Sequence, residues 1–185
     1  MPETDLAKKY QKKSDKQHIL DNPDTYIGSI ENMTTNCFIY DTSNSKICEK
    51  SIQFIPGLYK LFDEAIVNCR DHAIRMKQTI TDEKNYLVNN IAVSIDNDGI
   101  ITMFNDGNGI DVSIHPEYKI WIPELIFANL RTSTNYDKQE KKIVGGKNGF
   151  GFKLVLIYSK WGEIETVDHI RGRKYNPHVF LLLWY

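Results

Sequence analysis

The run Gly145-Gly-Lys-Asn-Gly-Phe-Gly-Phe-Lys153 constrains this chain more than any other stretch. It holds four glycines and two lysines, and it leads directly into the apolar run Leu154–Tyr158. Glycine lets the main chain approach a ligand closely, and the N-terminus of a helix offers unpaired N–H groups with a partial positive charge. The pattern therefore predicts either an anion cradle, most readily for phosphates, or a solvent-exposed glycine loop.

Two common phosphate motifs are excluded. A P-loop needs G-x-x-x-x-G-K-[ST] after a buried strand, but Phe152 follows Gly151 where lysine is required. The dinucleotide fingerprint fails because Leu154 stands where its third glycine should be. The residues before the run, 137–142, are charged and loop-like rather than a strand. A nucleotide site built on this run belongs to another fold.

Composition predicts one soluble intracellular domain. A chain of 185 residues can bury a proper core, and its net charge of −1 gives no global attraction to nucleic acid or anionic membrane. Three cysteines, Cys37, Cys48 and Cys69, are far apart and odd in number, which suits a reducing compartment and neither a disulfide framework nor a zinc site. No signal peptide opens the chain, and the last apolar run, 179–185, is too short to span a bilayer.

Strand and helix patterns alternate irregularly, which predicts an α+β protein with a mixed or antiparallel sheet. A polar, lysine-rich arm precedes them at 1–17, and residues 22–29 are expected to form a turn that runs into an extended segment. We expect strands at 36–41, 47–54, 91–95, 100–104, 163–168 and 178–185, and helices at 56–76, at 123–131 and after the glycine run.

The expected helix 56–76 carries a polar row beside its apolar stripe. Glu64, Asn68, Asp71 and Arg75 follow one another at steps of four, three and four, which aligns them along the helix axis. A carboxylate can polarise a water molecule, and an amide oxygen one turn later can hold Mg²⁺. The row is therefore either a catalytic face or an ordinary solvated face.

A second polar cluster, Asn105-Asp-Gly-Asn-Gly109, ends the second strand of the expected hairpin. Asn105 or Asp106 could accept a hydrogen bond from an exocyclic amine there. The other interpretation is a plain Asn-Asp-Gly turn, which is common.

Three segments, taken in chain order, resemble the Bergerat (GHKL) ATP-binding fold: Glu64-x-x-x-Asn68, Asn105-Asp-Gly-x-Gly109 and the glycine run. Further segments resemble one branch of it, the N-terminal ATPase region of eukaryotic-type (type IIA) DNA topoisomerase II. They are Tyr10-Gln-Lys-Lys, His18-Ile-Leu, Pro23-Asp-Thr-Tyr-Ile-Gly-Ser29, Phe62-Asp-Glu-Ala-Ile-Val-Asn68, Ile122-Pro-Glu-Leu-Ile-Phe127 and Thr132-Ser-Thr-Asn-Tyr136. The resemblance covers roughly residues 8–168 and is expected to fade beyond Asp168.

The resemblance implies a two-layer α/β sandwich with a mixed sheet and helices on one face, truncated at its C-terminus. Residues 1–17 would be an arm that a dimer exchanges, and residues 18–185 an incomplete ATP-binding domain. Glu64 would be the general base, and Asn68 would hold the Mg²⁺ that bridges the phosphates. For Asp71 and Arg75, a supporting or surface role is favoured.

The same resemblance implies the remaining contacts to ATP. Asn105 and Asp106 would recognise adenine, with Gly107 and Gly109 allowing close approach. Lys153 would add positive charge at the phosphates, and Tyr10 would reach the partner's nucleotide. The other contacts to ribose and phosphate would come from Ser133, Thr134 and Asn135, and from Gly146, Lys147, Asn148, Gly149, Phe150 and Gly151 of the glycine run.

The resemblance also implies a homodimeric clamp that ATP closes around double-stranded DNA, with no membrane role. Such a protein would act in the nucleus of a cellular eukaryote or, for a large DNA virus, in the host cytoplasm or the virion. The family's transducer segment and DNA-cleavage core do not fit in 185 residues. A catalytically weak or inert nucleotide-binding and dimerisation module, without topoisomerase activity of its own, is therefore the alternative. A histidine kinase is disfavoured because its nucleotide helix usually lacks a base at the position of Glu64.

Overall fold

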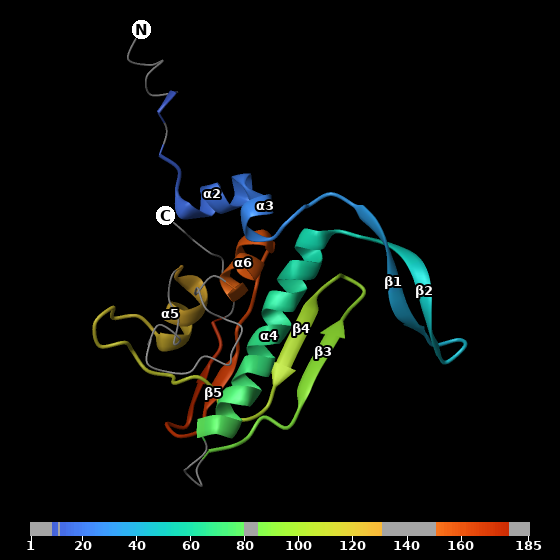
Figure 1. Cartoon of the computed structure of the whole chain (residues 1–185). Helices are drawn as coiled ribbons and strands as arrows, with labels where there is room; N and C mark the ends of the chain where they lie inside the picture. Colours follow the sequence, from blue (N-terminus) through green and yellow to red (C-terminus); the bar gives the residue numbers. More distant parts are fainter. Residues whose placement is uncertain (1–8, 11, 80–84, 131–150, 178–185) are drawn as a thin grey trace. The chain divides into compact units, whose positions relative to one another are not determined.

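The computed structural model describes residues 9–10, 12–79, 85–130 and 151–177 (Figure 1). The chain divides into two compact units, Met1–Lys60 and Leu61–Leu183. The predicted boundary between an arm and a domain at residue 17 stays a prediction.

The first unit opens with helix α2, Asp15–Asp21, which we did not expect. Its N-cap is Ser14, whose hydroxyl accepts a hydrogen bond from the Gln17 N–H at 3.2 Å. Ser14-x-x-Gln17 is a capping-box pattern, so the sequence did contain the signal for this helix. Asp15 adds a negative charge in the first turn, where the helix dipole favours it.

Helix α3, Pro23–Tyr26, replaces part of the extended segment expected at 22–29. Proline has a fixed φ that suits the first position of a helix, and Pro23 occupies that position. Gly28 then turns the chain with a φ of +89°. The expectation of an extended segment was wrong for Pro23–Tyr26, although the turn is present.

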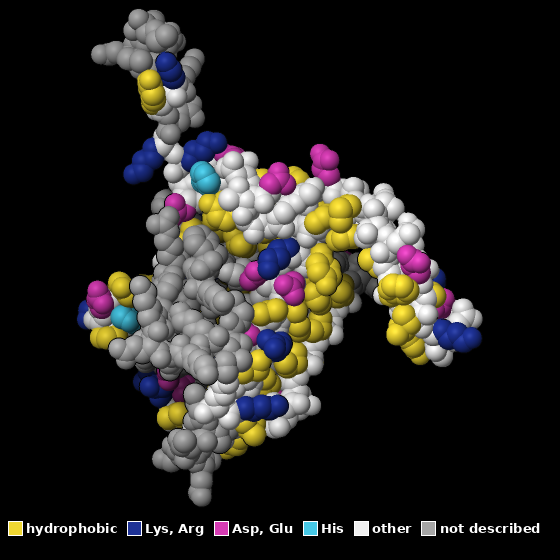
Figure 2. Space-filling view, viewed as in Figure 1, with side chains coloured by type: hydrophobic (Ala, Val, Ile, Leu, Met, Phe, Trp, Pro, Cys, Tyr) yellow, Lys and Arg dark blue, Asp and Glu magenta, His cyan; other side chains and the backbone are white. Residues whose placement is uncertain are grey.

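Strands β1, Met33–Asp41, and β2, Lys46–Phe54, pair antiparallel with Met33 opposite Phe54. Both predicted strands are therefore confirmed, β1 with three more residues. Large apolar side chains of this hairpin face solvent, among them Phe38, Tyr40 and Ile47. Figure 2 shows hydrophobic side chains on the surface of the molecule. Helix α4, Pro56–Thr79, follows β2 and continues into the second unit.

In the second unit, α4 buries Ala65 and Cys69 of its expected apolar stripe, and also Met76, each at most 9% exposed. The stripe is buried only in part, since Leu58 is 58% exposed. Asp71 is also buried, so it supports the helix from within rather than joining a solvated face. The Arg70 guanidinium lies 3.4 Å from an Asp71 carboxylate oxygen.

Strands β3, Ile91–Ile95, and β4, Ile101–Asn105, form the predicted antiparallel hairpin. The Asp96 carboxylate closes the turn by accepting hydrogen bonds from the N–H groups of Asp98 and Ile100. Gly99 takes a φ of +78°, which glycine adopts without strain.

Helices α5, Ile122–Ala128, and α6, Gly151–Tyr158, lie on either side of the longest stretch outside the described residues. Helix α5 ends before the predicted Arg131 because Asn129 has an extended backbone. The helix predicted after the glycine run is present, but it begins inside the run, at Gly151. It packs on α5 through an edge-to-face contact of Phe152 with Phe127 at 5.3 Å between ring centroids.

A short antiparallel hairpin of β5, Thr166–Asp168, and β6, Arg173–Tyr175, completes the described residues. Strand β5 is the end of the strand expected at 163–168. Strand β6 was not expected, although Gly172 between two arginines, with a φ of +61°, marks its turn. The strand expected at 178–185 lies outside the described residues.

The α+β class is confirmed, and every strand pairing among the described residues is antiparallel. The three hairpins are separate two-stranded sheets there. Within the same residues, no helix is both long and apolar enough to cross a membrane.

Candidate functional site

Helix α4 presents Glu64 and Asn68 one turn apart on one face, as their spacing requires. The Asn68 side-chain amide donates a hydrogen bond of 2.6 Å from Nδ2 to the Glu64 carbonyl oxygen. This bond occupies the nitrogen end of the amide and fixes its orientation. The oxygen end of the Asn68 amide is therefore the end suited to a ligand.

The Glu64 carboxylate lies against the first residue of α6. A Cβ atom built on Gly151 would be only 2.5 Å from Glu64 Oε2, so only glycine leaves the carboxylate its present place. The first N–H groups of a helix lack intrahelical partners, and the helix dipole makes this end partly positive. The acid of α4 and the partly positive end of α6 therefore meet, although they are far apart in the sequence.

Lys153 stands in the first turn of α6 and is only 5% exposed. Burial lowers the pKa of its ammonium group to about 8, because a low-dielectric surrounding disfavours the charged form. A phosphate beside this group would favour the charged form again.

Asp106, predicted to recognise adenine, is held by the segment that precedes β3. Its Oδ1 accepts hydrogen bonds from the N–H groups of Asn89, at 2.7 Å, and Asn90, at 2.9 Å. Its Oδ2 accepts one from the Asn90 side-chain amide at 2.8 Å. Hydrogen bonds from Asn90, and then from Asn89, lower the pKa of Asp106, so this side chain stays ionised and orders the loop. The neighbouring Asn105 amide donates to the Asp106 carbonyl oxygen.

Asn108 is a residue whose role sequence reasoning missed. Its side chain accepts a hydrogen bond of 2.8 Å from the Tyr86 N–H and donates one of 2.6 Å to Asn85 Oδ1. Its carbonyl oxygen lies 2.7 Å from His72 Nε2, which donates to it. Burial lowers the pKa of His72, which favours the neutral ring.

His72 is also a residue that the sequence could have indicated. The spacing of four that joins Glu64 to Asn68 continues to His72 on α4. Through its bond to Asn108, His72 ties the helix that carries Glu64 to the loop that carries Asn105 and Asp106. The two predicted parts of the site are thus linked by one hydrogen bond.

Gly107 and Gly109 are required by the packing of this loop on the protein itself. Gly107 has a φ of +92°, and a Cβ there would lie 2.8 Å from a Val88 methyl group. A Cβ on Gly109 would collide with the carbonyl oxygen of Val167 in β5. A role of either glycine in close approach to a nucleotide stays a prediction.

The remaining predicted contacts lie in the first unit or outside the described residues. Tyr10 belongs to the first unit and is 72% exposed. The following lie outside the described residues: Ser133, Thr134, Asn135, Gly146, Lys147, Asn148, Gly149 and Phe150. Their roles stay predictions.

No group of three His, Cys, Asp or Glu side chains that could hold a metal ion occurs in the part of the chain that the structure describes. Mg²⁺ commonly binds through one or two protein oxygens together with substrate phosphates. The oriented Asn68 amide fits that manner of binding, in which the nucleotide itself completes the metal's ligands.

We predict that Gly109→Ala destabilises the chain by about 1–3 kcal/mol, because the added methyl group meets the backbone of β5 rather than a side chain that can move. Denaturant unfolding of the variant and the parent measures this difference. Equal stability of the two chains would show that the loop does not pack on Val167 as described.

We also predict that tripolyphosphate binds with uptake of a proton near pH 8. Before any phosphate binds, Lys153 has a pKa of about 8 and is partly neutral there, and an adjacent phosphate raises that pKa. Affinity should therefore fall as pH rises through this value. Calorimetry in two buffers of different ionisation enthalpy measures the uptake, and Lys153→Gln should abolish it. An equal uptake in the variant would contradict the placement of Lys153 at the anion.

Comparison with known proteins places these features in a family. No protein-family model matches the chain. DNA topoisomerase 2 of Acanthamoeba polyphaga mimivirus is 51% identical to it over 175 residues, which cover 92% of this chain and 13% of that protein. The enzyme of the same name from Pisum sativum is 40% identical over 177 residues, which cover 95% of this chain and 11% of that protein.

A match over 95% of the chain cannot end at Asp168, so the expectation that the likeness fades there was wrong. Among solved structures, the ATPase region of Saccharomyces cerevisiae topoisomerase II is similar with a TM-score of 0.81 and 43% identity, over 92% of this chain and 43% of that one. The chain thus spans between 11% and 13% of the length of the two curated relatives. Over nearly its whole length, the chain belongs to the ATPase region of the type II DNA topoisomerase family.

Proposed function

We propose that this chain is the ATP-binding and ATP-hydrolysing part of a type II DNA topoisomerase. The observation that carries the proposal is the approach of the Glu64 carboxylate to Gly151 at the start of α6. An acid at the positive end of a helix whose first turn also carries a lysine offers groups that phosphoryl transfer to water uses. The protein's task in this reaction is to position water and to neutralise charge.

Each group has one role in this proposal. The N–H groups of the first turn of α6 and the Lys153 ammonium bind the phosphates. Glu64 accepts a hydrogen bond from the attacking water and orients it toward the γ-phosphate. The Asn68 side-chain oxygen holds Mg²⁺, which supplies neutralising charge at the phosphates when bound. Asn105 and the remaining acceptor capacity of Asp106 recognise the adenine amine.

The proposal extends to the assembly. ATP closes two copies of the chain as a clamp on double-stranded DNA, with the arm that contains Tyr10 exchanged between copies. Nucleotide drives closure because it binds the closed dimer better than the open one. The protein acts in the nucleus if it is from a cellular eukaryote, or in host cytoplasm or virion if it is from a large DNA virus.

A second candidate function is a nucleotide-binding and dimerisation module with little or no turnover. The two candidates share the nucleotide site and differ in hydrolysis.

Glu64→Gln separates them. We expect it to lower phosphate release from ATP by about 100-fold or more, the usual contribution of a general base, while a non-hydrolysable ATP analogue still binds. Asp63→Asn, the adjacent carboxylate of the same helix, is the control and should retain turnover. Parent protein that binds the analogue but releases no phosphate would support the inert module instead.

Gly151→Ala is expected to lower turnover about tenfold with little change in stability. The added methyl group meets the end of the Glu64 side chain, which is flexible and can move aside. The carboxylate then leaves its place beside α6. Alanine is favoured over glycine in a helix by up to ~1 kcal/mol, so unfolding should not become easier. Steady-state phosphate release and thermal unfolding measure the two effects. A variant with full turnover would show that the position of Glu64 beside α6 does not matter.

A further inference from the structure

A buried carboxylate outside the nucleotide contacts has no role in the reaction proposed above. Asp168, the last residue of β5, is 4% exposed. Burial alone raises the pKa of this group, but hydrogen bonds from the Val112 N–H and from Arg171 outweigh it and lower the pKa to about 2. Asp168 is therefore ionised, and a buried charge is retained only where it is well paired.

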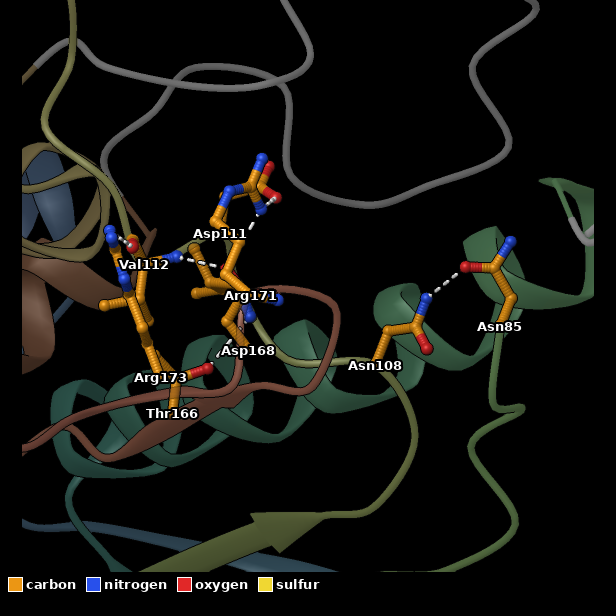
Figure 3. Close-up of polar contacts among 9 residues, drawn as sticks. Asn85, Asn108, Asp111, Val112, Thr166, Asp168, Arg171 and Arg173 are labelled. Carbon is orange, nitrogen blue, oxygen red and sulfur yellow. Dashed lines mark hydrogen bonds and ion pairs between the residues drawn. The ribbon is translucent and has the colours of Figure 1, made fainter.

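Asp168 has one partner, Val112, in the loop that follows β4, and another, Arg171, in its own hairpin. The Val112 N–H donates a hydrogen bond of 2.9 Å to Asp168 Oδ2, and both groups are buried (Figure 3). The Arg171 guanidinium donates to the same oxygen at 2.9 Å and also reaches the Asp111 carboxylate. A single arginine thus joins the acid of the hairpin to an acid of the loop.

Other residues of the hairpin also form hydrogen bonds to the same loop. Thr166 Oγ1 accepts a hydrogen bond of 2.8 Å from the Ile110 N–H, and Arg173 donates one of 3.2 Å to the Val112 carbonyl oxygen. Alternate residues of β5, together with Arg173 of β6, therefore bind three backbone groups of residues 110–112. Gly109 lies so close to Val167 that no side chain fits between them.

These contacts begin directly after the residues assigned to adenine. Asn105 and Asp106 are followed by Gly107–Gly109, and residues 110–112 are the anchored end of the loop. The loop is also held at Asn108 through Asn85, Tyr86 and His72. At its start, the Asp106 carboxylate accepts hydrogen bonds from Asn89 and Asn90. A loop with side-chain anchors on both sides keeps its shape only while the anchors remain.

We propose that Asp168 and Thr166 are positioning residues for adenine recognition: they hold residues 110–112 so that the Asn105–Gly109 loop keeps the shape that the base requires. The proposal rests on the proposed ATP-binding function. Neither residue is expected to touch nucleotide. The phosphate end of the site, built by α4 and α6, does not depend on this hairpin through any of these bonds.

The test compares Asp168→Asn and Thr166→Val in the full chain with the parent. Asp168→Asn replaces the carboxylate opposite the Val112 N–H with an amide, whose oxygen is a weaker acceptor and whose nitrogen is a donor. Thr166→Val removes the hydroxyl that accepts from the Ile110 N–H and leaves a side chain of nearly equal volume. Lys174→Gln is the matched control, because it breaks only the exposed pair with Glu165 on the same hairpin. Titration calorimetry with Mg²⁺ present measures the Kd of a non-hydrolysable ATP analogue, the matching GTP analogue and tripolyphosphate.

We expect both variants to weaken binding of the ATP analogue about tenfold, a typical cost of a loosened supporting contact, and to reduce its preference over the GTP analogue. Tripolyphosphate should bind within about twofold of the parent, since its contacts are elsewhere. Hydrogen exchange at the Ile110 amide in Thr166→Val, and at the Val112 amide in Asp168→Asn, should become faster. The Lys174→Gln control should match the parent in each measurement.

An unchanged preference for adenine over guanine would overturn the proposal, as would an equal loss of affinity for tripolyphosphate, which indicates a merely structural role. If Asp168→Asn does not fold, the nearly isosteric Thr166→Val decides by the same criteria. Parent protein that binds no nucleotide would overturn the proposed function and this proposal with it. If the parent protein binds ATP and both variants bind it equally well, this proposal alone would be overturned.

Discussion

The contact between the Glu64 carboxylate and Gly151 is the constraint on which the site depends. It joins the middle of helix α4 to the first turn of helix α6, and a side chain at position 151 would displace the carboxylate. The contact also explains why the glycine run continues into the helix instead of ending before it. Glycine costs up to about 1 kcal/mol relative to alanine in a helix interior, and at this first position of α6 it leaves the space that the acid occupies.

Helical periodicity made part of this site predictable. The spacing of Glu64 and Asn68 placed them on one face, and the change from glycines to the apolar run Leu154–Tyr158 predicted α6, although its start at Gly151 lies inside the glycine run. Helix α2 was missed although Ser14 and Gln17 carry its cap, because the lysines before it suggested an unstructured arm. Strand β6 was missed because three residues are too few for a periodic pattern.

Contacts between distant segments could not be predicted in this way. Asp168 finds Val112 and Arg171 only because the hairpin β5–β6 meets the loop after β4, and no local pattern encodes that meeting. The burial of Lys153 has the same origin, since the sequence shows a lysine in a first turn but not what surrounds it. Gly107 and Gly109 suggested an approach to ligand, whereas the structure shows that protein backbone and Val88 already require both. Residue type indicated the kind of chemistry, and tertiary packing determined which atoms each group contacts.

A crystal structure of the chain with Mg²⁺ and a non-hydrolysable ATP analogue tests the central claim most directly. We predict that the γ-phosphate lies at the first turn of α6 and that a water between it and Glu64 is within hydrogen-bond reach of the carboxylate, about 2.6–3.2 Å. A nucleotide bound elsewhere on the chain, or a Glu64 carboxylate turned away from Gly151 and from the phosphate, would contradict the assignment.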